Sequence, residues 1–354
     1  MSKTQVAVLG ATGMIGQRFV QLLEGHPWFE MEGLYASERS DGKRLAEVNK
    51  VKDHAFMEDT LSRRIELIDI AKIAKRCRVA FSGLPSDIAK DYEAKLAEAG
   101  VAVFSNAASH RMREDVPIII PEVNSEHLEI VRTQPTYPKG GYIVTNANCS
   151  TTGMAAPLKA LQDAFGLDQV VVSTYQAVSG AGYPGVPSLD ILGNVIPYIK
   201  GEEDKMEAEA AKILGTYHLG KIHDATFQVL ASCARVPVHD GHLEALTVKT
   251  AKDASAEECA KVMREFRAEP QELNLPTAPR QPIIVREEAD RPQPLWDVNA
   301  GEPARAKGMA VTVGRVRKKD KYVKFFLLSH NTIRGGAGGS VINAELAQAK
   351  GMLR

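Results

Sequence analysis

The sequence predicts an α/β protein in which a doubly wound parallel sheet is followed by an α+β part with a mixed sheet. A strand, a glycine-rich turn and a helix open the chain, and strands then alternate with helices up to Cys149. Such alternation is typical of a parallel sheet with helices on both faces. Beyond Cys149 strands follow one another with few helices between them, which favours a mixed or antiparallel sheet covered on one face.

The opening segment predicts a dinucleotide site. Gln5-Val-Ala-Val-Leu9 is the first strand, and an amphipathic helix follows the turn Gly10-Ala-Thr-Gly13-Met-Ile-Gly16. This G-x-x-G-x-x-G spacing is a relative of the G-x-G-x-x-G pattern, whose glycines allow a tight turn and close approach of a pyrophosphate. The helix N-terminus then binds that anion. We therefore expect a Rossmann-type domain here, the alternative being a plain strand-to-helix turn.

The tip of the second strand, residues 29–36, favours NADP over NAD. NAD sites usually place an acid there to hold the ribose hydroxyls. Here the tip continues as Ser37-Glu-Arg39-Ser40, with Lys43 just beyond. Two hydroxyls and two cations could hold a 2′-phosphate, whereas Glu38 could instead serve a bare ribose.

Further polar residues fall at the ends of later strands. Residues 79–82 and 101–104 predict two strands, and ligands bind at the carboxyl ends of such parallel strands. Gly83, Ser86, Asn106 and Cys149 all lie at such ends, so we expect Cys149 beside the nicotinamide. The expected domains are residues 1–148 with 333–354 for NADP, and residues 149–332 for catalysis and dimerisation. The last helix, residues 340–348, should follow a Gly-rich linker and pack back onto the first domain.

Cys149 is a candidate nucleophile. The segment Asn146-Ala-Asn-Cys149-Ser-Thr follows a β-branched run and precedes a predicted helix. A thiol there lies near the unpaired N–H groups of the first helical turn, and the positive end of the helix dipole favours the thiolate. The alternative is a buried structural cysteine.

The second half adds a possible base and a possible anion anchor. Arg235 and His242 flank the segment Val-Pro-Val-His239-Asp-Gly. A histidine that leaves a strand could activate Cys149, and an arginine could hold a substrate carboxylate with two hydrogen bonds. The residues alone do not separate His242 from His239. The basic run at 315–321 predicts an exposed hairpin turn.

Composition narrows the function classes. The 44 basic and 44 acidic residues give zero formal charge, which argues against a nucleic-acid partner. We expect no signal peptide and no membrane span. The four cysteines form no C-x-x-C pair, so we expect neither a metal site nor a disulfide framework, and a reducing, cytoplasmic setting.

Several motifs in the same order make the chain resemble the aspartate-β-semialdehyde dehydrogenases of the archaeal and fungal branch over essentially its whole length. These motifs are the glycine turn at 10–16, the cysteine segment at 146–151, Gln176-Ala-Val-Ser-Gly-Ala-Gly182, Glu202-Glu-Asp-Lys205, the segment from Arg235 to His242, and Ser329-His-Asn-Thr-Ile-Arg-Gly-Gly-Ala-Gly-Gly339.

The resemblance implies a role for each matching residue. Cys149 would form an acyl thioester, His242 rather than His239 would be the acid/base, and Gln176 would orient the acyl group. The expected substrate contacts are Arg235 and Glu202 for the carboxylate and amino ends, Arg111 and Lys205 for phosphate, and Asn148 beside the nucleophile. The expected cofactor contacts are Gly10, Thr12, Gly13, Met14, Ile15, Gly16, Ser37, Arg39, Ser40, Ser86, Ser179, Gly180 and Asn331.

The implied reaction is the NADPH-dependent, reversible conversion of L-aspartyl-4-phosphate to L-aspartate 4-semialdehyde, a step toward lysine, threonine, methionine and isoleucine. A homodimer through the second domain, possibly paired into a tetramer, is also implied. Two enzymes of the same scaffold remain alternatives, malonyl-CoA reductase and N-acetyl-γ-glutamyl-phosphate reductase. A non-catalytic NADP-sensing protein is a remote one, because it should have lost Cys149, His242 or Gln176.

Overall fold

The computed structural model describes residues 2–353, and its first sheet is parallel throughout. The strand order is β3-β2-β1-β4-β5-β6. The chain runs outward from β1 in one direction and then returns to build β4 on the other side, which creates a switch point between β1 and β4, the usual ligand position in such sheets. The strands are β1 (Thr4–Leu9), β2 (Phe29–Ala36), β3 (Ile65–Leu67), β4 (Val79–Ser82), β5 (Ala102–Ser105) and β6 (Tyr142–Thr145).

Apolar side chains on both faces explain why this sheet is covered on both sides. Val6 and Val8 point into one core cluster, while Ala7 and Leu9 point into another. The helices of this part are α1 (Met14–Leu23), α2 (Leu45–Val48), α3 (Glu58–Ser62), α4 (Ile70–Arg76), α5 (Ser86–Glu98), α6 (Pro121–Asn124) and, from the far end of the chain, α13 (Gly338–Ala349). The doubly wound prediction is confirmed.

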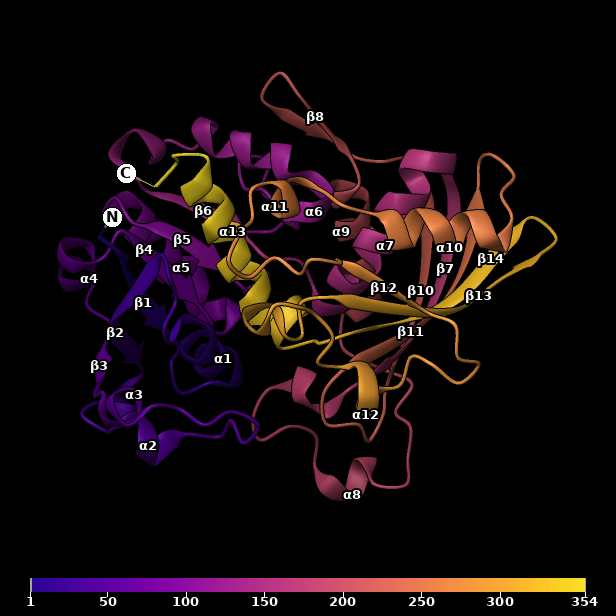
Figure 1. The fold of residues 1–354 in the computed structure, drawn as a ribbon. Helices are drawn as coiled ribbons and strands as arrows, with labels where there is room; N and C mark the ends of the chain where they lie inside the picture. The colour runs from indigo at the N-terminus through magenta and orange to yellow at the C-terminus, as the bar shows by residue number, and fades with distance from the viewer. Residues whose placement is uncertain (1, 354) are drawn as a thin grey trace.

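The second sheet is mixed, as predicted, with the order β10-β7-β11-β14-β13-β12. Figure 1 shows it beside the first sheet, with α7 and α10 packed over it. Its strands are β7 (Leu167–Gln176), β10 (Gln228–Arg235), β11 (His242–Thr250), β12 (Ile283–Arg286), β13 (Val311–Lys319) and β14 (Tyr322–Ser329), and β8 (Thr216–His218) with β9 (Lys221–His223) forms a separate hairpin. The helices are α7 (Cys149–Phe165), α8 (Ser188–Ile191), α9 (Glu202–Ile213), α10 (Ala256–Glu265), α11 (Glu269–Glu272) and α12 (Pro294–Asp297).

One expectation about local structure was wrong, and another was met only in part. The Gly-rich segment before the last helix is not a linker, because the short π-helix η6 (Ile333–Ala337) runs directly into α13. Glycines are needed there for close packing, since a Cβ at Gly339 would lie 2.5 Å from Asn146 Oδ1. The basic run is mostly strand, because β13 continues to Lys319 and only Asp320 and Lys321 form the turn.

The last helix packs back onto the first sheet, as predicted. Val341, Ile342 and Leu346 belong to the same apolar cluster as β1, β4 and β5, and Figure 1 shows α13 alongside β5 and β6. The chain therefore crosses between the two sheets twice, and both crossings, after β6 and after β14, lie near Cys149. Among residues 2–353, no helix combines the length and apolar character that crossing a membrane requires.

Candidate active site

A cavity of about 350 Å³ lies where the two crossings meet. The glycine turn, the start of α7, the loop after β7, the start of α9 and the segment after β14 all contribute walls. The predicted site residues that line it are Met14, Ile15, Ser86, Arg111, Asn148, Cys149, Ser179, Gly180, Glu202, Lys205 and Asn331. Residues from seven separate stretches of sequence, including the start of α5 and the loop after β5, therefore share one cavity.

Cys149 is the first residue of α7, and Asn148 is its N-cap. The Asn148 Oδ1 accepts hydrogen bonds from the N–H groups of Ser150 and Thr151 at 2.9 and 3.1 Å. Asparagine is a favoured N-cap because its side chain satisfies such N–H groups. The strand-to-helix turn predicted for Cys149 is thus present, between the end of β6 and the start of α7.

His242, rather than His239, contacts the nucleophile. Its Nε2 lies 3.2 Å from Cys149 Sγ. Its Nδ1 accepts a hydrogen bond from the N–H of Ala177 at 3.1 Å, so in a neutral ring the proton belongs on Nε2, facing the sulfur. His239 is exposed, and its Nδ1 lies 2.7 Å from Asp240 Oδ2, within hydrogen-bond distance.

Burial controls both ionisable groups of this pair. Burial, together with Glu202, raises the pKa of the Cys149 thiol well above its usual range, against the opposing effect of Arg235 and Arg111. Burial, together with Arg235 and His330, lowers the pKa of His242 to about 3. Burial therefore opposes the effect of the helix end on the Cys149 thiol, and it favours the neutral form of the His242 imidazole.

The predicted substrate residues surround this pair. Gln176 and Arg235 are neighbours on β7 and β10. Gln176 Nε2 donates to Glu202 Oε1 at 3.0 Å, and Arg235 Nη1 donates to the Ala177 carbonyl at 2.8 Å. All three side chains are buried. The site thus presents one cation and one anion close to the thiol.

The other predicted anion-binding residues, Arg111 and Lys205, also line the cavity. Arg111, in the loop after β5, pairs with Glu209 at 2.8 Å and donates to the Asn106 carbonyl at 2.9 Å. Lys205 lies one helical turn after Glu202 on α9 and also lines the cavity. Two cations therefore flank the space in front of Cys149.

The glycine turn has the geometry that a dinucleotide needs. Gly13 is the N-cap of α1 and offers no side-chain cap, so the first N–H groups of the helix remain open to an anion. Gly10 has φ +72°, and a Cβ at Gly16 would lie 2.0 Å from the Gly10 carbonyl oxygen. Only glycine allows this close turn.

The remaining predicted cofactor residues fall into two groups. Ser37, Arg39 and Ser40 form the short helix η1 (Glu38–Ser40) and its cap at the end of β2, outside the cavity and toward solvent. Asn331 bridges two other elements, because its Nδ2 donates to Ser179 Oγ at 2.8 Å and its Oδ1 accepts from the Gly241 N–H at 2.9 Å. Thr12 lies within the glycine turn, before α1.

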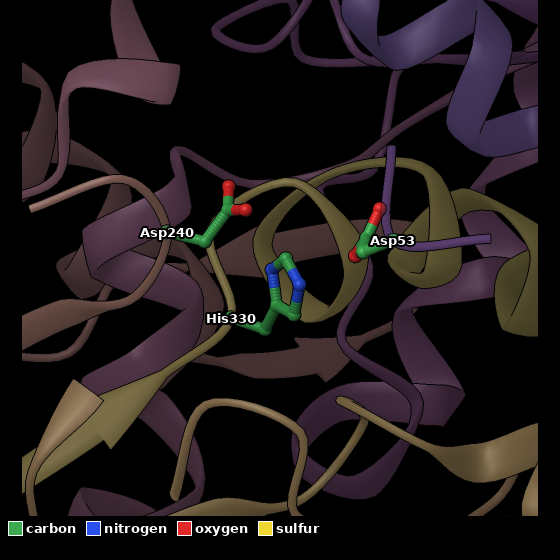
Figure 2. Close-up of side chains that lie close together, drawn as sticks. All are labelled: Asp53, Asp240 and His330. Atoms are coloured by element: carbon green, nitrogen blue, oxygen red, sulfur yellow. The ribbon is translucent and has the colours of Figure 1, made fainter. Parts of the chain in front are cut away.

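A group of possible metal ligands lies nearby. Figure 2 shows Asp53, Asp240 and His330 facing one another. The Arg18 guanidinium, however, lies 2.7 Å from Asp53 Oδ1 and 3.6 Å from Asp240 Oδ2. A protein cation therefore already compensates both carboxylates, and the cluster fits an ion-pair network between α1 and the loop before His242.

Sequence reasoning missed three contributors. The Ala177 N–H selects the tautomer of His242, and no pattern signals a backbone contact of that kind. Gly335 lies against Cys149, since a Cβ there would be 2.7 Å from that of the cysteine. Glu209, which pairs with Arg111, had a signal: it follows Glu202 by two helical turns and so shares its face.

Comparison with known proteins agrees with this geometry. Residues 5–131 match the model of the semialdehyde dehydrogenase NAD-binding domain, and residues 158–334 match that of the semialdehyde dehydrogenase dimerisation domain. The chain is 49% identical to the aspartate-semialdehyde dehydrogenase of Archaeoglobus fulgidus over 96% of this chain and 97% of that protein. It is 44% identical to that of Aspergillus fumigatus, over 99% of each.

A solved structure is similar as well. The crystal structure of the Candida albicans aspartate-semialdehyde dehydrogenase with NADP superposes with a TM-score of 0.89 at 39% identity, covering 99% of this chain and 100% of that chain.

Proposed function

The chain belongs to the aspartate-semialdehyde dehydrogenase family, and from that premise we propose the role of each site residue. The enzyme is an NADP-dependent oxidoreductase that acts on aldehydes, and its reaction is the reversible reductive dephosphorylation of L-aspartyl-4-phosphate to L-aspartate 4-semialdehyde. The observation that carries the mechanism is the 3.2 Å contact between Cys149 Sγ and His242 Nε2 in a cavity lined by cations.

Cys149 attacks the acyl carbon of the acyl phosphate. A carbon–sulfur bond forms, the bond from the acyl carbon to the phosphate oxygen breaks, and inorganic phosphate leaves with the bonding electron pair and takes up the proton of the Cys149 thiol. Covalent catalysis of this kind divides one difficult reduction into two easier steps. The thioester then lies beside the proposed cofactor site. NADPH, when bound, supplies the hydride that reduces the thioester carbonyl.

His242 assists the sulfur from Nε2. Because Nδ1 already accepts the Ala177 N–H, the neutral ring donates Nε2–H toward Sγ and stabilises negative charge there. That charge is present when the thiolate attacks, and again when the reduced adduct collapses and the sulfur leaves. As the aldehyde is released, the same Nε2–H hydrogen bond stabilises the departing thiolate.

Each charged side chain of the site is assigned to one charged group of the substrate. We assign Arg111 and Lys205 to the phosphate, whose charge they offset as it leaves. Arg235 binds the α-carboxylate and Glu202 the α-ammonium group, since they lie on either side of the Gln176 amide. Gln176 orients the acyl group. Asn148 positions Cys149 through the N-cap of α7.

The cofactor residues follow the two halves of a dinucleotide. We assign Gly10, Thr12, Gly13, Met14, Ile15 and Gly16 to the pyrophosphate, and Ser37, Arg39 and Ser40 to the 2′-phosphate. Ser86, Ser179, Gly180 and Asn331 would then lie near the nicotinamide. The open helix end at Gly13 and the forced glycine at position 16 support this assignment.

At the level of the chain, we propose that residues 1–148 and 333–354 form the NADP-binding domain and residues 149–332 the catalytic and dimerisation domain. A homodimer, or a tetramer built from two such dimers, fits the exposed apolar side chains on the open face of the second sheet, such as Val171, Tyr175 and Leu230. The absence of a disulfide among the four free cysteines of the described chain fits a reducing, cytoplasmic setting.

The test is phosphate-dependent reduction of NADP with L-aspartate 4-semialdehyde, in the unaltered enzyme and in Cys149→Ser. We expect activity that requires phosphate and that disappears in the variant, while NADP binding persists. Activity with malonyl-CoA or with an N-acetylated substrate, and none with the free amino-acid aldehyde, would refute the substrate assignment. Equal rates with NAD would refute the roles of Ser37, Arg39 and Ser40.

A further inference from the structure

Four charged side chains recur along one face of α9. Glu202, Lys205, Glu209 and Lys212 follow one another at intervals of three or four residues, which brings them to the same side of a helix. Glu202 and Lys205 line the cavity, whereas Glu209 and Lys212 are buried behind it. The first two have substrate roles above, and the second two have none.

Glu209 connects Arg111 with the turn that carries the nucleophile. Its Oε1 lies 2.8 Å from Arg111 Nη1, and its Oε2 accepts a hydrogen bond from the Asn148 N–H at 2.6 Å. Only 3% of its side chain is exposed. Because each oxygen is committed to one partner, a single rigid carboxylate sets the spacing between the guanidinium and Cys149.

Lys212 holds the main chain of the same loop. Its Nζ donates to the carbonyl oxygens of Arg111, Arg113 and Val116 at 2.7, 2.8 and 2.8 Å. An ammonium group has three donors, so all of them are used within this loop. α9 therefore fixes both the side chain and the backbone of Arg111.

These contacts leave one edge of the arginine available. Nη1 pairs with Glu209 and Nη2 donates to the Asn106 carbonyl, while Nε is buried without a partner among the described residues. A buried charged donor without a partner is costly unless a ligand meets it. A tetrahedral oxyanion, which accepts hydrogen bonds from several donors at once, has suitable chemistry.

We propose that Glu209 is a positioning residue for phosphate. It holds the Arg111 guanidinium so that its unpartnered donor meets the phosphate oxygens at a set distance from Cys149 Sγ. Glu209 does not line the cavity and so acts through Arg111. The inference rests on the phosphate role proposed above for Arg111.

The test is steady-state kinetics of Glu209→Gln in the direction that consumes phosphate. Glutamine offers one acceptor oxygen and one NH₂ group, so it cannot accept from both Arg111 and Asn148. We expect the KM for phosphate to rise roughly tenfold, the loss of one charge-assisted hydrogen bond, while the KM for NADP stays unchanged. Asp204→Asn, an exposed change on the same helix, should behave like the unaltered enzyme.

A double-mutant cycle with Arg111→Lys separates the two proposals. If Glu209 acts through Arg111, adding Glu209→Gln to Arg111→Lys should raise the KM for phosphate no further. An unchanged or lower KM for phosphate in Glu209→Gln, with a raised one in Arg111→Lys, would overturn the positioning role alone. No effect of Arg111→Lys on phosphate would overturn the role of Arg111. Equal rises for phosphate and NADP would indicate general disorder and would also overturn the inference.

Discussion

Gly180 lies against Arg235 and His242, two of the side chains to which we assign roles in the reaction. A Cβ at this position would be 2.8 Å from Arg235 Nη1 and 3.2 Å from His242 Nε2. Both of those side chains are buried and hydrogen-bonded to the main chain of Ala177, so neither can yield without losing a contact. At the residue scale, the absence of a side chain here is part of the catalytic arrangement.

Gly180→Ala should therefore lower kcat/KM by about a hundredfold, the typical effect of moving catalytic groups by about 1 Å. The melting temperature should stay close to that of the unaltered protein, because the change lies at a cavity wall and not in an apolar core. Steady-state kinetics and thermal unfolding measure the two quantities. Unaltered kcat/KM would mean that Arg235 and His242 can shift freely.

The element that closes the site from behind is η6 with the start of α13. Arg334 forms two hydrogen bonds with Glu122, at 2.9 and 2.7 Å, and both side chains are buried. The next residue, Gly335, touches Cys149 so closely that a Cβ would lie 2.7 and 2.8 Å from its Cβ and Cα. The ion pair therefore holds a segment with no space for a side chain directly against the nucleophile.

For this element we predict that Gly335→Ala destabilises the fold by about 1 to 3 kcal/mol, as overpacking usually does, and abolishes most activity because Cys149 is displaced. Denaturant unfolding and the rate of Cys149 alkylation measure these effects. Gly351→Ala, at the end of the same helix, is the matched control. A Cβ at Gly351 would contact nothing within 4 Å. Because the φ of this residue is +66°, the substitution should cost only backbone strain, about 1 to 2 kcal/mol. Full activity in Gly335→Ala would contradict the role of this contact.

Across the whole molecule, buried histidines link stability to pH. Burial lowers the pKa of His127 to about 4, and its Nδ1 lies 3.1 Å from Asn124 Nδ2. Below the ordinary histidine pKa of about 6.5, His127 binds a proton in the unfolded chain but not in the folded chain. The contribution of His127 to stability is thus complete above about pH 6.5 and falls as the pH drops toward 4. His242 and His330, whose pKa values are also lowered, act in the same direction.

The free energy of unfolding should fall between pH 7 and pH 4.5 in both proteins. In His127→Gln this fall should be smaller than in the unaltered protein by about 2 to 3 kcal/mol. Denaturant unfolding at the two pH values gives the comparison. The variant can be less stable at both, because only the pH dependence is predicted. Parallel losses in the two proteins would show that His127 does not titrate in this range.

The open face of the second sheet carries a prediction about assembly. Val171 and Tyr175 alternate outward on β7, and Leu230 lies on the neighbouring strand β10, each about 40% exposed (38, 40 and 42%). Tyr175→Asp, which puts a charge on this apolar face, should shift the protein from dimer toward monomer. Light scattering during size-exclusion chromatography measures the mass. An unchanged dimer would place the interface elsewhere.

Most of the fold could be predicted from short-range patterns in the sequence. Strand and helix periods, the glycine turn and the change of texture after Cys149 depend on near neighbours in sequence, so the parallel sheet, the mixed sheet and the nucleophile's turn were predictable from the residues. The prediction of a linker at 335–339 was wrong. A run of glycines in a sequence usually indicates a flexible segment, whereas here the glycines permit tight packing against Asn146 and Cys149.

The sequence by itself determined the family, the reaction and the cofactor, because ordered motifs such as Gly10 to Gly16 and Asn146 to Thr151 resemble those of a known family in residue type, spacing and order. The residues without the resemblance did not separate His242 from His239, and the tertiary structure shows that His242 contacts Cys149. Only the tertiary structure decided which nitrogen of His242 carries the proton and that Glu209 holds Arg111. Those depend on contacts between residues 65 to 98 positions apart, and on the burial that suppresses ionisation of the thiol and the imidazole. Both arise only when the two sheets are brought together.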